Sequence, residues 1–352
     1  MVKDGTFTGE GNRDMNMLGR GALGAAYIWL ERQPNSIYNG SLHGRQKAEK
    51  GRHRMKNPLK RIAHRARNFL IDPLQPSLTT RYPDAASQLQ LKFTYRALLE
   101  SGNALPALEE VGFKTFSQTD EDGILLYIFS IIGTVTKKCV EICAGNGIEC
   151  NTANLIINHG WSGLLVDGNE KLVKQGCEFY RTNPCTRVYP PKFIRSWVTL
   201  ENVNEVIKES NFDGEIDLLS IDMDGVDYWI WEAIEAIEPR VVIAEYQDII
   251  GPDKALTVPY KDDFNAYEYP TTLGMPNFCG ASLPAFVKLG KKKGYRLVGC
   301  NRYGYNAFFV KNTCGEKQIP EIPIKECFKH PKVLWGMKER FPTVKDLPWV
   351  EV

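Results

Sequence analysis

The fold of this chain is decided by one stretch of sequence, Cys139-Val-Glu-Ile-Cys-Ala-Gly-Asn-Gly147. It reads as a short apolar strand that carries an acid and runs into a Gly-x-Gly turn before a helix. Glycines at Gly145 and Gly147 remove the Cβ atoms that would keep a ligand away from the backbone. The helix that follows, capped near Asn151 or Thr152, offers free N–H groups to an anionic or carboxylate group. The stretch therefore predicts a ligand site at the end of a strand of an α/β sheet.

A second acid follows at the end of the next predicted strand. Asp167 ends the apolar run in Leu164-Leu-Val-Asp-Gly-Asn169 and lies 20 residues beyond Gly147. This spacing suits an acid that accepts hydrogen bonds from ribose hydroxyls. Together, the glycine turn and Asp167 predict a nucleotide-type ligand.

Two cofactors compete for this geometry. A dinucleotide site favours G-x-G-x-x-G after an uncharged strand, whereas this chain has G-x-G-x-x-C and places Glu141 near the strand end. That carboxylate would repel a pyrophosphate but would attract the amino and sulfonium groups of S-adenosylmethionine (SAM). SAM is therefore the better match by charge. The alternative role for Glu141 is purely structural, as an acid that caps neighbouring backbone.

Short apolar runs alternate with helical stretches after Phe116, which is typical of βαβ units. The strands that we expect are Lys138–Cys143, Gly163–Val166, Val188–Ile194, Ile216–Ile221, Arg240–Glu245, Tyr295–Cys300 and Ala307–Lys311. The helices that we expect are Asp120–Ile132, Asn151–His159, Glu170–Tyr180, Leu200–Glu209, Tyr228–Ile237 and Leu283–Lys293. The last two strands are joined by the short turn Asn301–Asn306, so they should pair antiparallel.

The chain divides into four parts. Residues 1–76 are rich in Gly, Asn and Arg and predict a basic, largely irregular extension with one short helical stretch over Ala22–Arg32. Residues 77–115 predict a helical cap, residues 116–311 the functional domain, and residues 312–352 an irregular tail that packs down.

The charged residues are unevenly distributed along an otherwise ordinary globular composition. The chain has 43% hydrophobic and 24% charged residues and a net charge of +2, which favours neither a nucleic-acid nor a membrane partner. Residues 41–70, however, contain ten Lys or Arg and one acid, Glu49. The basic arm 45–67 lacks the interleaved aromatic side chains that stack on bases. We therefore expect the arm to be solvated and the protein to have no nucleic-acid partner. The positive charge of the arm does not exclude such a partner.

Neither a membrane span nor a secretory signal is expected from the sequence. The longest apolar run, Gly21–Leu30, is far shorter than the roughly 20 residues that a spanning helix needs. The acidic N-terminal residues lack the basic and apolar regions of a signal peptide. Nine cysteines without short-spaced pairs favour a reducing, cytoplasmic location.

A buried strand delivers three acids to its carboxyl end. The stretch Ile216-Asp-Leu-Leu-Ser-Ile-Asp-Met-Asp-Gly-Val-Asp-Tyr228 places Asp222, Asp224 and Asp227 where α/β sheets bind ligands. Such acids bind a hard cation, position a substrate hydroxyl or act as a general base, and Asp227 has the alternative role of capping the next helix. Asp222 and Asp224 are our catalytic candidates. We assign no metal ligand and regard Mg²⁺ as possible but not expected.

The string Asp222-Met-Asp-Gly-Val226 also resembles the nucleophile motif of haloacid-dehalogenase-type phosphatases. That family places the motif on its first strand, whereas two nucleotide-type strands precede it here. The family also needs a later acidic pair on strand ends, but Asp262-Asp263 lies in a polar, Tyr-rich loop. We therefore reject this function.

Five ordered motifs resemble the FkbM-type SAM-dependent methyltransferases. The motifs are Phe116-Ser-Gln-Thr-Asp-Glu-Asp-Gly123, Val140-Glu-Ile-Cys-Ala-Gly-Asn-Gly147, Gly160-Trp-Ser-Gly-Leu-Leu-Val-Asp167, Ile216-Asp-Leu-Leu-Ser-Ile-Asp-Met-Asp-Gly225 and Arg240-Val-Val-Ile-Ala-Glu-Tyr246. The resemblance covers about Phe116 to Lys311. It implies the Rossmann-like, seven-stranded class I methyltransferase sheet of order 3-2-1-4-5-7-6, with an antiparallel last strand. It implies nothing about the basic arm.

The resemblance also implies roles for individual residues. By the family pattern, Glu141, Gly145 and Gly147 line the methionine end of SAM. Asp167 takes the ribose, and Asp222 faces the transferring methyl group. The other cofactor contacts that we expect are Arg195 or Ser196 beside the adenine, and Gln118, Asn146, Thr152 and Asn169 along the same motifs.

This chain departs from the family pattern at two positions. Asp224 stands where many relatives have Glu, and Cys143 stands where many have Gly. The first change keeps an acid, whereas the second adds a side chain at a point of close cofactor packing.

The expected function is SAM-dependent O-methylation of a hydroxyl on a sugar or another small polar metabolite. Methyl transfer from a sulfonium is an in-line displacement on an activated carbon, so positioning does most of the work and only the nucleophile's proton needs a base. The alternatives are an NAD-type Rossmann oxidoreductase and a non-catalytic SAM- or nucleotide-binding protein. The sequence identifies neither the acceptor nor the oligomeric state.

Three further features receive expectations of their own. His159 precedes Gly160 and should end a helix. Cys143 and Cys150 should be structural. The Tyr- and Phe-rich loop Tyr260–Phe278 should be the substrate lid.

Overall fold

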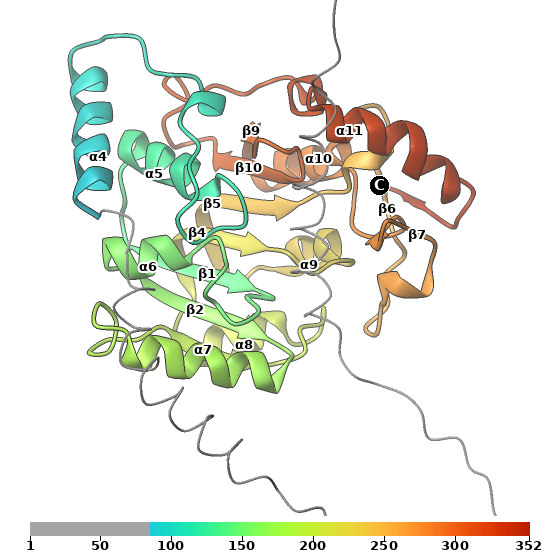
Figure 1. The fold of residues 1–352 in the computed structure, drawn as a ribbon, viewed down its shortest axis with the longest axis horizontal. Helices are drawn as coiled ribbons and strands as arrows, with labels where there is room; N and C mark the ends of the chain where they lie inside the picture. Colours follow the sequence, from blue (N-terminus) through green and yellow to red (C-terminus); the bar gives the residue numbers. More distant parts are fainter. Residues whose placement is uncertain (1–84) are drawn as a thin grey trace, which may run out of the picture. The chain divides into compact units, whose positions relative to one another are not determined.

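The computed structural model of the chain describes residues 85–352 (Figure 1). The helical stretch expected over Ala22–Arg32 and the basic arm 45–67 lie outside the described residues. Within residues 85–352, no helix combines the length and the apolar character that crossing a bilayer requires.

A seven-stranded sheet runs through the centre of the described part. Its strands lie in the order β3-β2-β1-β4-β5-β10-β9. Strand β10 runs antiparallel to both of its neighbours, and the other pairs are parallel. The expected α/β, Rossmann-like fold with strand order 3-2-1-4-5-7-6 is confirmed. The strands are β1 (Lys138–Ile142), β2 (Ser162–Asp167), β3 (Lys192–Arg195), β4 (Gly214–Ile221), β5 (Ile237–Glu245), β9 (Tyr295–Cys300) and β10 (Asn306–Lys311).

Helices cover both faces of the sheet (Figure 1). Helices α5, α6 and α7 pack on one face, and α8, α9 and α10 pack on the other, so each face has its own apolar core. Helix α4 lies outside α5, where Tyr95 meets Tyr127 edge-on at 5.0 Å between ring centroids. The helices are α4 (Ala85–Glu100), α5 (Glu121–Ile132), α6 (Ala153–His159), α7 (Glu170–Thr182), α8 (Val203–Glu209), α9 (Asp227–Ala233) and α10 (Leu283–Lys293).

The strand sequences are nearly continuous apolar runs because both faces of the sheet are covered. Along β4, Leu219 and Ile221 join the core under α8 to α10, whereas Leu218 joins the core under α5 to α7. Side chains alternate along a strand, so Ser220 and its neighbour in register, Glu141 of β1, face the α5–α7 layer. This alternation determines which acids can reach the helices of that layer.

The third strand begins later than expected. The run Val188–Ile194 was predicted to be extended throughout, but β3 starts at Lys192, and the first two residues of the run are 90% and 73% exposed. Pro190 and Pro191 separate those residues from the strand, and proline cannot donate a hydrogen bond to the ladder. The first half of this prediction is therefore wrong.

The boundary between α9 and β5 also differs from the prediction. Helix α9 ends at Ala233, not at Ile237, and β5 already begins at Ile237. The sequence argued against this early start because Pro239 lies within the strand. Pairing with β10 begins only at Val241, so the missing N–H of Pro239 interrupts no bond on that side.

The C-terminal segment 312–352 is more regular than expected. The Arg340 side chain is buried and donates hydrogen bonds to Asn277 Oδ1 at 2.9 Å and to the carbonyl oxygen of Pro276 at 2.8 Å. These contacts hold the segment against the rest of the described chain, and it contains short regular elements that the prediction of an irregular tail did not include. Its elements are α11 (Pro331–Trp335), a π-helical turn (Gly336–Arg340) and β11 (Val350–Glu351), which pairs antiparallel with β6 (Leu256–Thr257).

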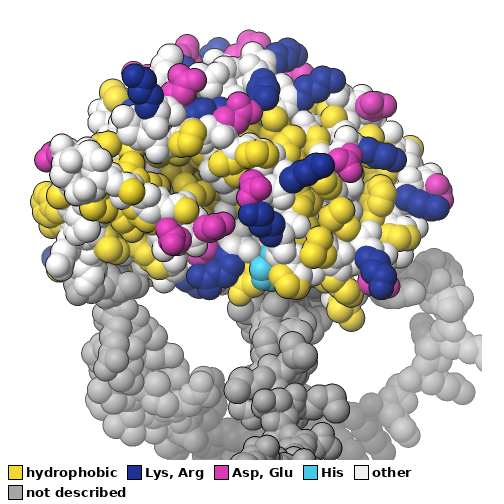
Figure 2. All heavy atoms as spheres, turned by 90° about the horizontal axis from the view of Figure 1, so that it is seen from above, with side chains coloured by type: hydrophobic (Ala, Val, Ile, Leu, Met, Phe, Trp, Pro, Cys, Tyr) yellow, Lys and Arg dark blue, Asp and Glu magenta, His cyan; other side chains and the backbone are white. Residues whose placement is uncertain are grey.

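Charges of both signs are mixed on the face that Figure 2 shows. Lys and Arg side chains alternate there with Asp and Glu side chains, and hydrophobic side chains fill the spaces between them. This face therefore carries no field of a single sign.

Candidate functional site

The turn after β1 brings bare backbone to the carboxyl edge of the sheet. Gly145 and Gly147 have φ angles of +60° and +66°, which glycine adopts without a steric penalty. A Cβ on Gly145 would meet no atom within 4 Å, whereas one on Gly147 would come within 2.8 Å of Leu165 and Phe193. Gly145 therefore leaves open space for a ligand, and Gly147 allows the turn to pack against the sheet.

The surroundings of Cys143 and Cys150, in and just after this turn, disfavour a reactive thiol at either residue. Cys143 has a φ of +61°, a conformation that costs a side-chain-bearing residue about 1 kcal/mol and explains why glycine is common there in the family that the sequence resembles. Cys150 is buried, with its Sγ 3.4 Å from the carbonyl oxygen of Gly147. Burial raises the pKa of both thiols well above the ordinary value, which disfavours a reactive thiolate.

Glu141 caps the helix that follows the turn. Its Oε1 accepts from the backbone N–H of Asn151 at 2.9 Å, and its Oε2 accepts from the N–H of Thr152 at 2.9 Å and from the Thr152 hydroxyl at 2.6 Å. The sequence left two roles open for Glu141, and the structure shows the capping role. Glu141 and Thr152 are only 3% and 0% exposed, so little of either side chain is open to a ligand, and their contact with a cofactor stays a prediction.

Asp167 connects the first two strand ends. Its Oδ2 accepts from the N–H of Gly145 at 2.8 Å, and its Oδ1 accepts from the N–H of Asn169 at 2.7 Å. These two bonds fix the orientation of the carboxylate. The structure therefore places Asp167 beside the open backbone of Gly145.

The two asparagines that were predicted to contact the cofactor make local hydrogen bonds. Asn169 Oδ1 caps α7 by accepting from the N–H groups of Lys171 and Leu172 at 3.0 and 3.3 Å. Asn146 Oδ1 accepts from the N–H of Ile148 at 3.0 Å and shapes the glycine turn. Both residues lie beside Gly145 or Asp167 in the chain, and their contact with a cofactor stays a prediction.

The rim next to Asp167 contains the residues predicted to neighbour an adenine. The N–H of Ser196 donates to the carbonyl oxygen of Asp167 at 3.0 Å, and the exposed Arg195 pairs with Glu170 at 3.2 Å. Sequence reasoning missed Trp197, which is 64% exposed. Its position directly after the predicted adenine neighbours was an available signal.

The Trp197 ring is held in a defined position. A Cβ on Gly168 would lie 2.9 Å from the ring, so the indole covers the backbone just beyond Asp167. The indole N–H donates to the carbonyl oxygen of Asp262 at 2.7 Å. An exposed, anchored aromatic ring at this rim offers a stacking surface for a planar base.

Gln118 lies in the loop that leads into α5. The side chain of Asp122 fixes this loop, since its Oδ2 accepts from the N–H groups of Thr115, Phe116 and Ser117 at 2.7, 2.6 and 2.8 Å. Burial raises the pKa of Asp122 to about 6, although the three N–H groups act in the opposite direction. Gln118 itself is exposed, and its contact with a cofactor stays a prediction.

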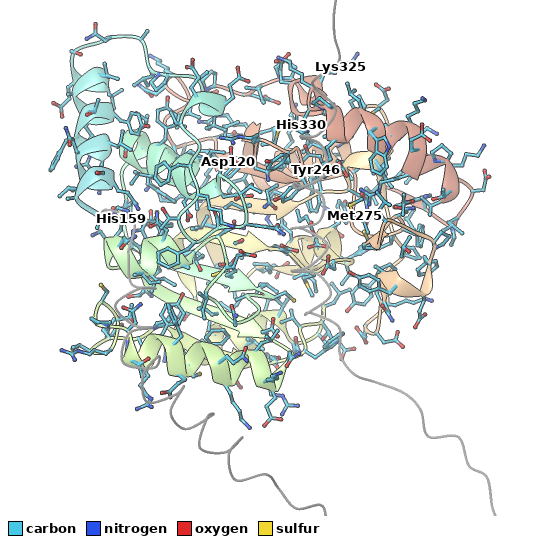
Figure 3. All side chains as sticks on the ribbon, in the orientation of Figure 1. Asp120, His159, Tyr246, Met275, Lys325 and His330 are labelled. Atoms are coloured by element: carbon cyan, nitrogen blue, oxygen red, sulfur yellow. The ribbon has the colours of Figure 1, made fainter. Side chains whose placement is uncertain are left out.

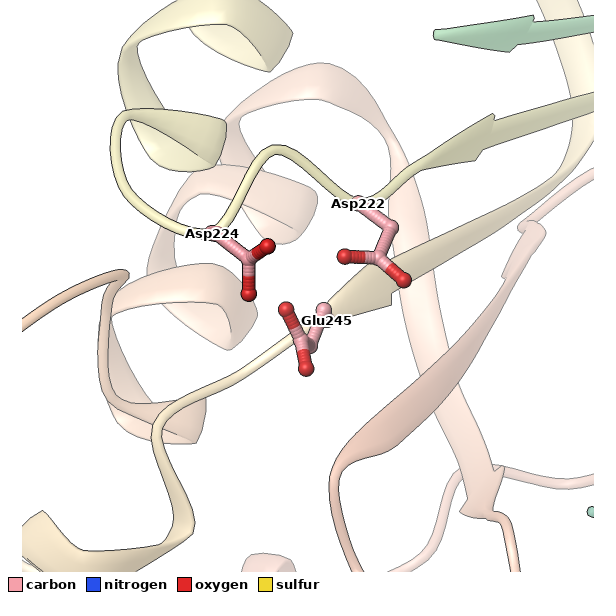
Figure 4. Close-up of side chains that lie close together, drawn as sticks. All are labelled: Asp222, Asp224 and Glu245. Carbon is pink, nitrogen blue, oxygen red and sulfur yellow. The ribbon is translucent and has the colours of Figure 1, made fainter. Parts of the chain in front are cut away.

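Three carboxylates meet where β4 and β5 end (Figure 4). Asp222 and Asp224 come from the loop after β4, and Glu245 is the last residue of β5. One oxygen from each of them lies within 4.8 Å of the others. The structure thus brings the two predicted catalytic acids together and adds Glu245, which the sequence analysis did not select. We refer to these three residues as the acidic cluster.

The three carboxylates of the acidic cluster repel one another when all of them are ionised. Burial, followed by the charges of Asp222 and Asp224, raises the pKa of Glu245 well above its ordinary value. A proton shared within the cluster relieves this repulsion, and so would a divalent cation bound by carboxylate oxygens. The acidic cluster is therefore the place among the described residues where a metal ion could be held.

Asp227 holds the loop that carries two of these acids. Its carboxylate accepts from the N–H of Met223 at 2.6 Å and from the N–H of Gly225 at 3.1 Å. It is fully buried, and burial raises its pKa to about 6. The alternative role, capping of the next helix, is not the one observed, because α9 begins at Asp227 itself and its N-cap residue is Val226. Asp227 instead fixes the preceding loop and so positions Asp222 and Asp224 on either side of Met223.

The first residue of β10, Asn306, and the residue before it, Tyr305, are two polar residues near the acidic cluster. Asn306 pairs with Glu245 in register, and its buried Oδ1 has no hydrogen-bond partner among the described residues. Burial raises the pKa of the neighbouring Tyr305, and the charges of Glu121 and Glu245 add to this effect, so its hydroxyl stays protonated near the cluster. The sequence predicted this hairpin but not which of its residues face the carboxyl edge.

The segment Tyr260–Phe278 is anchored beside the same edge (Figure 1). Its Tyr260 hydroxyl accepts from the N–H of Leu200 at 3.0 Å, and its Phe264 ring packs against the backbone of Gly225. Leu273, between β7 (Thr271–Thr272) and β8 (Met275–Pro276), is 81% exposed. An anchored base and an exposed tip fit the predicted lid, whose movement stays a prediction.

His159 lies far from the acidic cluster. It is the last residue of α6, and Gly160 follows with a φ of +65°, so the predicted helix end is confirmed. Figure 3 shows His159 on the opposite side of the sheet from Met275. The residue therefore has no place in the chemistry of the carboxyl edge.

No family model matches the chain, and no curated protein matches it. Several solved structures are similar to it. They include a magnesium protoporphyrin IX methyltransferase from Synechocystis with bound SAM, with 12% identity, 72% of this chain and 96% of that chain covered and a TM-score of 0.31. An O-methyltransferase from Bacillus cereus in complex with SAH has 14% identity, with 67% and 96% covered and a TM-score of 0.35. A SAM-dependent methyltransferase from Clostridium acetobutylicum has 10% identity, with 72% and 99% covered and a TM-score of 0.33. Sequence identities of 10% to 14% with TM-scores of 0.31 to 0.35 do not identify the reaction of this chain.

Proposed function

We propose that the chain is a SAM-dependent methyltransferase of the FkbM type that methylates a hydroxyl group on a sugar or another small polar metabolite. The observation that carries the proposal is the arrangement of groups along one sheet edge. Open backbone at Gly145 follows β1, Asp167 ends β2, and the acidic cluster lies beyond β4 and β5. Ligands of open α/β sheets bind at the carboxyl ends of the strands, where all these groups lie.

The residues at this edge fit SAM. Asp167 would hold the ribose, and the Trp197 ring would stack on the adenine. Gly145 leaves room for the remainder of the molecule because its backbone faces open space. When bound, SAM supplies a methyl group on a sulfonium, a carbon that is already activated for displacement.

Two features of the structure disfavour a dinucleotide. The order 3-2-1-4-5-6 of a dinucleotide fold is parallel, whereas this sheet ends in the antiparallel strand β10 followed by β9. A pyrophosphate also binds the free N–H groups at the start of the first helix. Here the Glu141 carboxylate already accepts from the N–H groups of Asn151 and Thr152. The carboxylate thus places a negative charge directly before the helix, where a pyrophosphate would approach.

The acids of the chain act on the acceptor. Asp222 or Asp224 would take the proton from the acceptor hydroxyl as it becomes a nucleophile. Burial and the charges of Asp222 and Asp224 raise the pKa of Glu245, which favours its protonated form, and a protonated Glu245 would donate a hydrogen bond that orients the acceptor oxygen. Carboxylates are weak ligands for phosphodiester backbones because the charges repel, which favours a small polar acceptor over a nucleic acid.

A transfer experiment tests the reaction. The purified chain is incubated with a metabolite extract and SAM that carries a deuterated methyl group, and products are found by their mass gain. We expect a low-molecular-weight product whose mass rises by one labelled methyl group. Incorporation into RNA or DNA instead would refute the proposed substrate class, and SAM binding without any product would indicate a binding protein.

A chelator arm of the same experiment addresses the acidic cluster. If a divalent cation neutralises the cluster, EDTA stops the transfer and Mg²⁺ restores it. If a shared proton does so, EDTA leaves the rate unchanged. We expect the second result, because burial and the neighbouring acids already raise the pKa of Glu245 well above its ordinary value.

A further inference from the structure

A cavity of about 220 Å³ lies at the opposite edge of the sheet from the acidic cluster. Two of its lining residues, Lys137 and Trp161, directly precede β1 and β2, so they lie where the parallel strands begin. The other walls come from α4, α5 and the end of α6, including Lys92, Phe129 and His159. Figure 3 shows His159 at this side of the sheet, below α4. The cavity is therefore separate from the proposed methyl-transfer site.

The loop under this cavity is rigidly held. The Asp217 carboxylate accepts from the N–H groups of Val135, Thr136 and Lys137 at 2.7 to 3.1 Å. Arg240 pairs with Asp217 at 2.9 Å and donates two further hydrogen bonds to backbone carbonyls of the same loop. Lys137 has a φ of +51°, a conformation that costs a residue with a side chain about 1 kcal/mol or more. The network thus stabilises an unfavourable backbone at a residue that lines the cavity.

The cavity carries positive charge without a counter-charge. Lys92 and Lys137 both line it, and among residues 85–352 neither has an ion-pair partner within 4.0 Å. Burial, the guanidinium of Arg96 and the ammonium of Lys137 all lower the pKa of Lys92. An anion in the cavity would reverse the effect of these charges.

His159 provides a polar group that can respond to such an anion. Its Nε2 lies 2.8 Å from Gln88 Oε1, which can only accept, so Nε2 carries the hydrogen. Burial, followed by the charges of Lys92 and Lys137, lowers the pKa of His159 to about 4. The ring is therefore neutral at pH 7, and Nδ1 is its acceptor atom.

The remaining walls are mostly apolar and aromatic, with Thr134 and Asn158 as their polar members. Phe129 and Trp161 meet edge-on with ring centroids 4.8 Å apart, and Leu126 and Leu155 complete this part of the lining. A dry cavity of about 150 Å³ can hold one benzene molecule. The present volume is larger and is open to solvent beside Leu89, which is 47% exposed, so a six-membered ring with a small charged head group would fit.

From this lining we propose that the cavity binds a small organic anion with a planar apolar body and a single carboxylate, its head group between Lys92 and Lys137 and its ring against Phe129 and Trp161. The site is distinct from the methyl-transfer edge and does not rest on the proposed function. Helix α6 runs between the two places, since Asn151 and Thr152 directly before it bind Glu141 and its last residue lines the cavity.

The test uses benzoate as the probe and the full chain as the protein. Ligand-observed NMR gives the Kd of benzoate and of benzyl alcohol, which has the same ring without the charge. Protein NMR follows the five histidines of the chain through a pH titration. The variants are Lys92→Gln and Lys137→Gln, and the matched control is Lys171→Gln, an exposed lysine on α7. Circular dichroism confirms that each variant is folded.

We expect benzoate to bind and benzyl alcohol to bind at least about tenfold more weakly, which corresponds to about 1.4 kcal/mol for the lost charge. Each lysine variant should weaken benzoate by about five- to tenfold, and Lys171→Gln should leave it unchanged. Saturation with benzoate should raise the pKa of His159. Equal affinity for the two probes, unchanged binding in both lysine variants or an unmoved His159 titration would each refute the proposal.

Discussion

The substitution Glu141→Gln separates the two roles that the sequence allowed for this acid. In the structure the carboxylate accepts two backbone hydrogen bonds and one hydroxyl hydrogen bond at the start of α6, and a further one from the Ser220 hydroxyl at 3.4 Å. An amide nitrogen cannot accept, so the variant leaves the N–H of Asn151 or of Thr152 facing another donor. If Glu141 instead faces the sulfonium of SAM, the substitution should act on the ligand and not on the fold.

The expected loss of stability follows from these contacts. One buried N–H without an acceptor costs about 1–3 kcal/mol, and losing a buried negative charge at a helix N-terminus costs up to about 2 kcal/mol more. We therefore expect the free energy of unfolding to fall by about 3 kcal/mol in Glu141→Gln. The affinity of the folded variant for SAM should stay within about tenfold of the wild type, because the Gly145 backbone and Asp167 remain in place.

Urea unfolding followed by tryptophan fluorescence measures the stability, and calorimetry on the folded variant measures the Kd of SAM. The control is Glu149→Gln, which removes a partly exposed carboxylate from an ion pair with Lys114 at 3.3 Å. This control should change the stability by less than about 1 kcal/mol. An unchanged urea midpoint in Glu141→Gln, combined with a SAM affinity about a hundredfold weaker, would refute the capping argument.

Further predictions concern the ligand edge and the buried acids. Asp222→Asn should abolish transfer in a tritium assay while the Kd of SAM stays within about tenfold, since this acid acts mainly during the reaction. Asp167→Ala should weaken SAM by about tenfold or more, with kcat at saturating SAM largely retained. Trp197→Ala should cost about 1–3 kcal/mol of SAM binding through lost stacking, measured by calorimetry. Between about pH 4 and pH 6, Asp122 and Asp227 should lower the stability as pH rises. The folded state holds their protons up to a pKa of about 6, whereas the unfolded chain releases them near the ordinary value of 3.8.

Each of these predictions has a result that would contradict it. Normal turnover in Asp222→Asn would show that the transferred methyl group is elsewhere, and normal SAM affinity in Asp167→Ala or Trp197→Ala would place the nucleoside elsewhere. For the pH dependence, Asp122→Asn is the comparison. Urea titrations should show that the variant loses part of the fall in stability seen in the wild type between pH 4 and pH 6. Parallel curves for the two proteins would refute the assignment.

The strands and helices followed from the sequence because their signals are local, whereas the order of the strands within the sheet was expected only from the family resemblance. Apolar runs, helical periods and short connections identify strands and their direction, and α10 was predicted at its observed bounds, Leu283–Lys293. The error in β3 had a local cause as well. Val188 and Tyr189 have strong strand propensity, and only the two prolines that follow signalled that the strand begins later.

The site residues were predictable from the sequence only where they lie together on one segment of the chain. Asp222 and Asp224 lie on a single loop and were selected, whereas Glu245 joins them only because β5 lies beside β4. The end of the predicted strand at Glu245 and the expected strand order together contained this information. The orientation of Glu141 was not available in the same way, because it depends on how closely the start of α6 approaches β1 in three dimensions.

The most direct test of the central claim is calorimetry of the full chain with SAM, S-adenosylhomocysteine and NADH. We predict one site that binds SAM, that S-adenosylhomocysteine competes for, and that Asp167→Ala weakens, with no heat of binding for NADH. Binding of NADH without any response to SAM or S-adenosylhomocysteine would contradict the assignment and would favour a dehydrogenase-like protein.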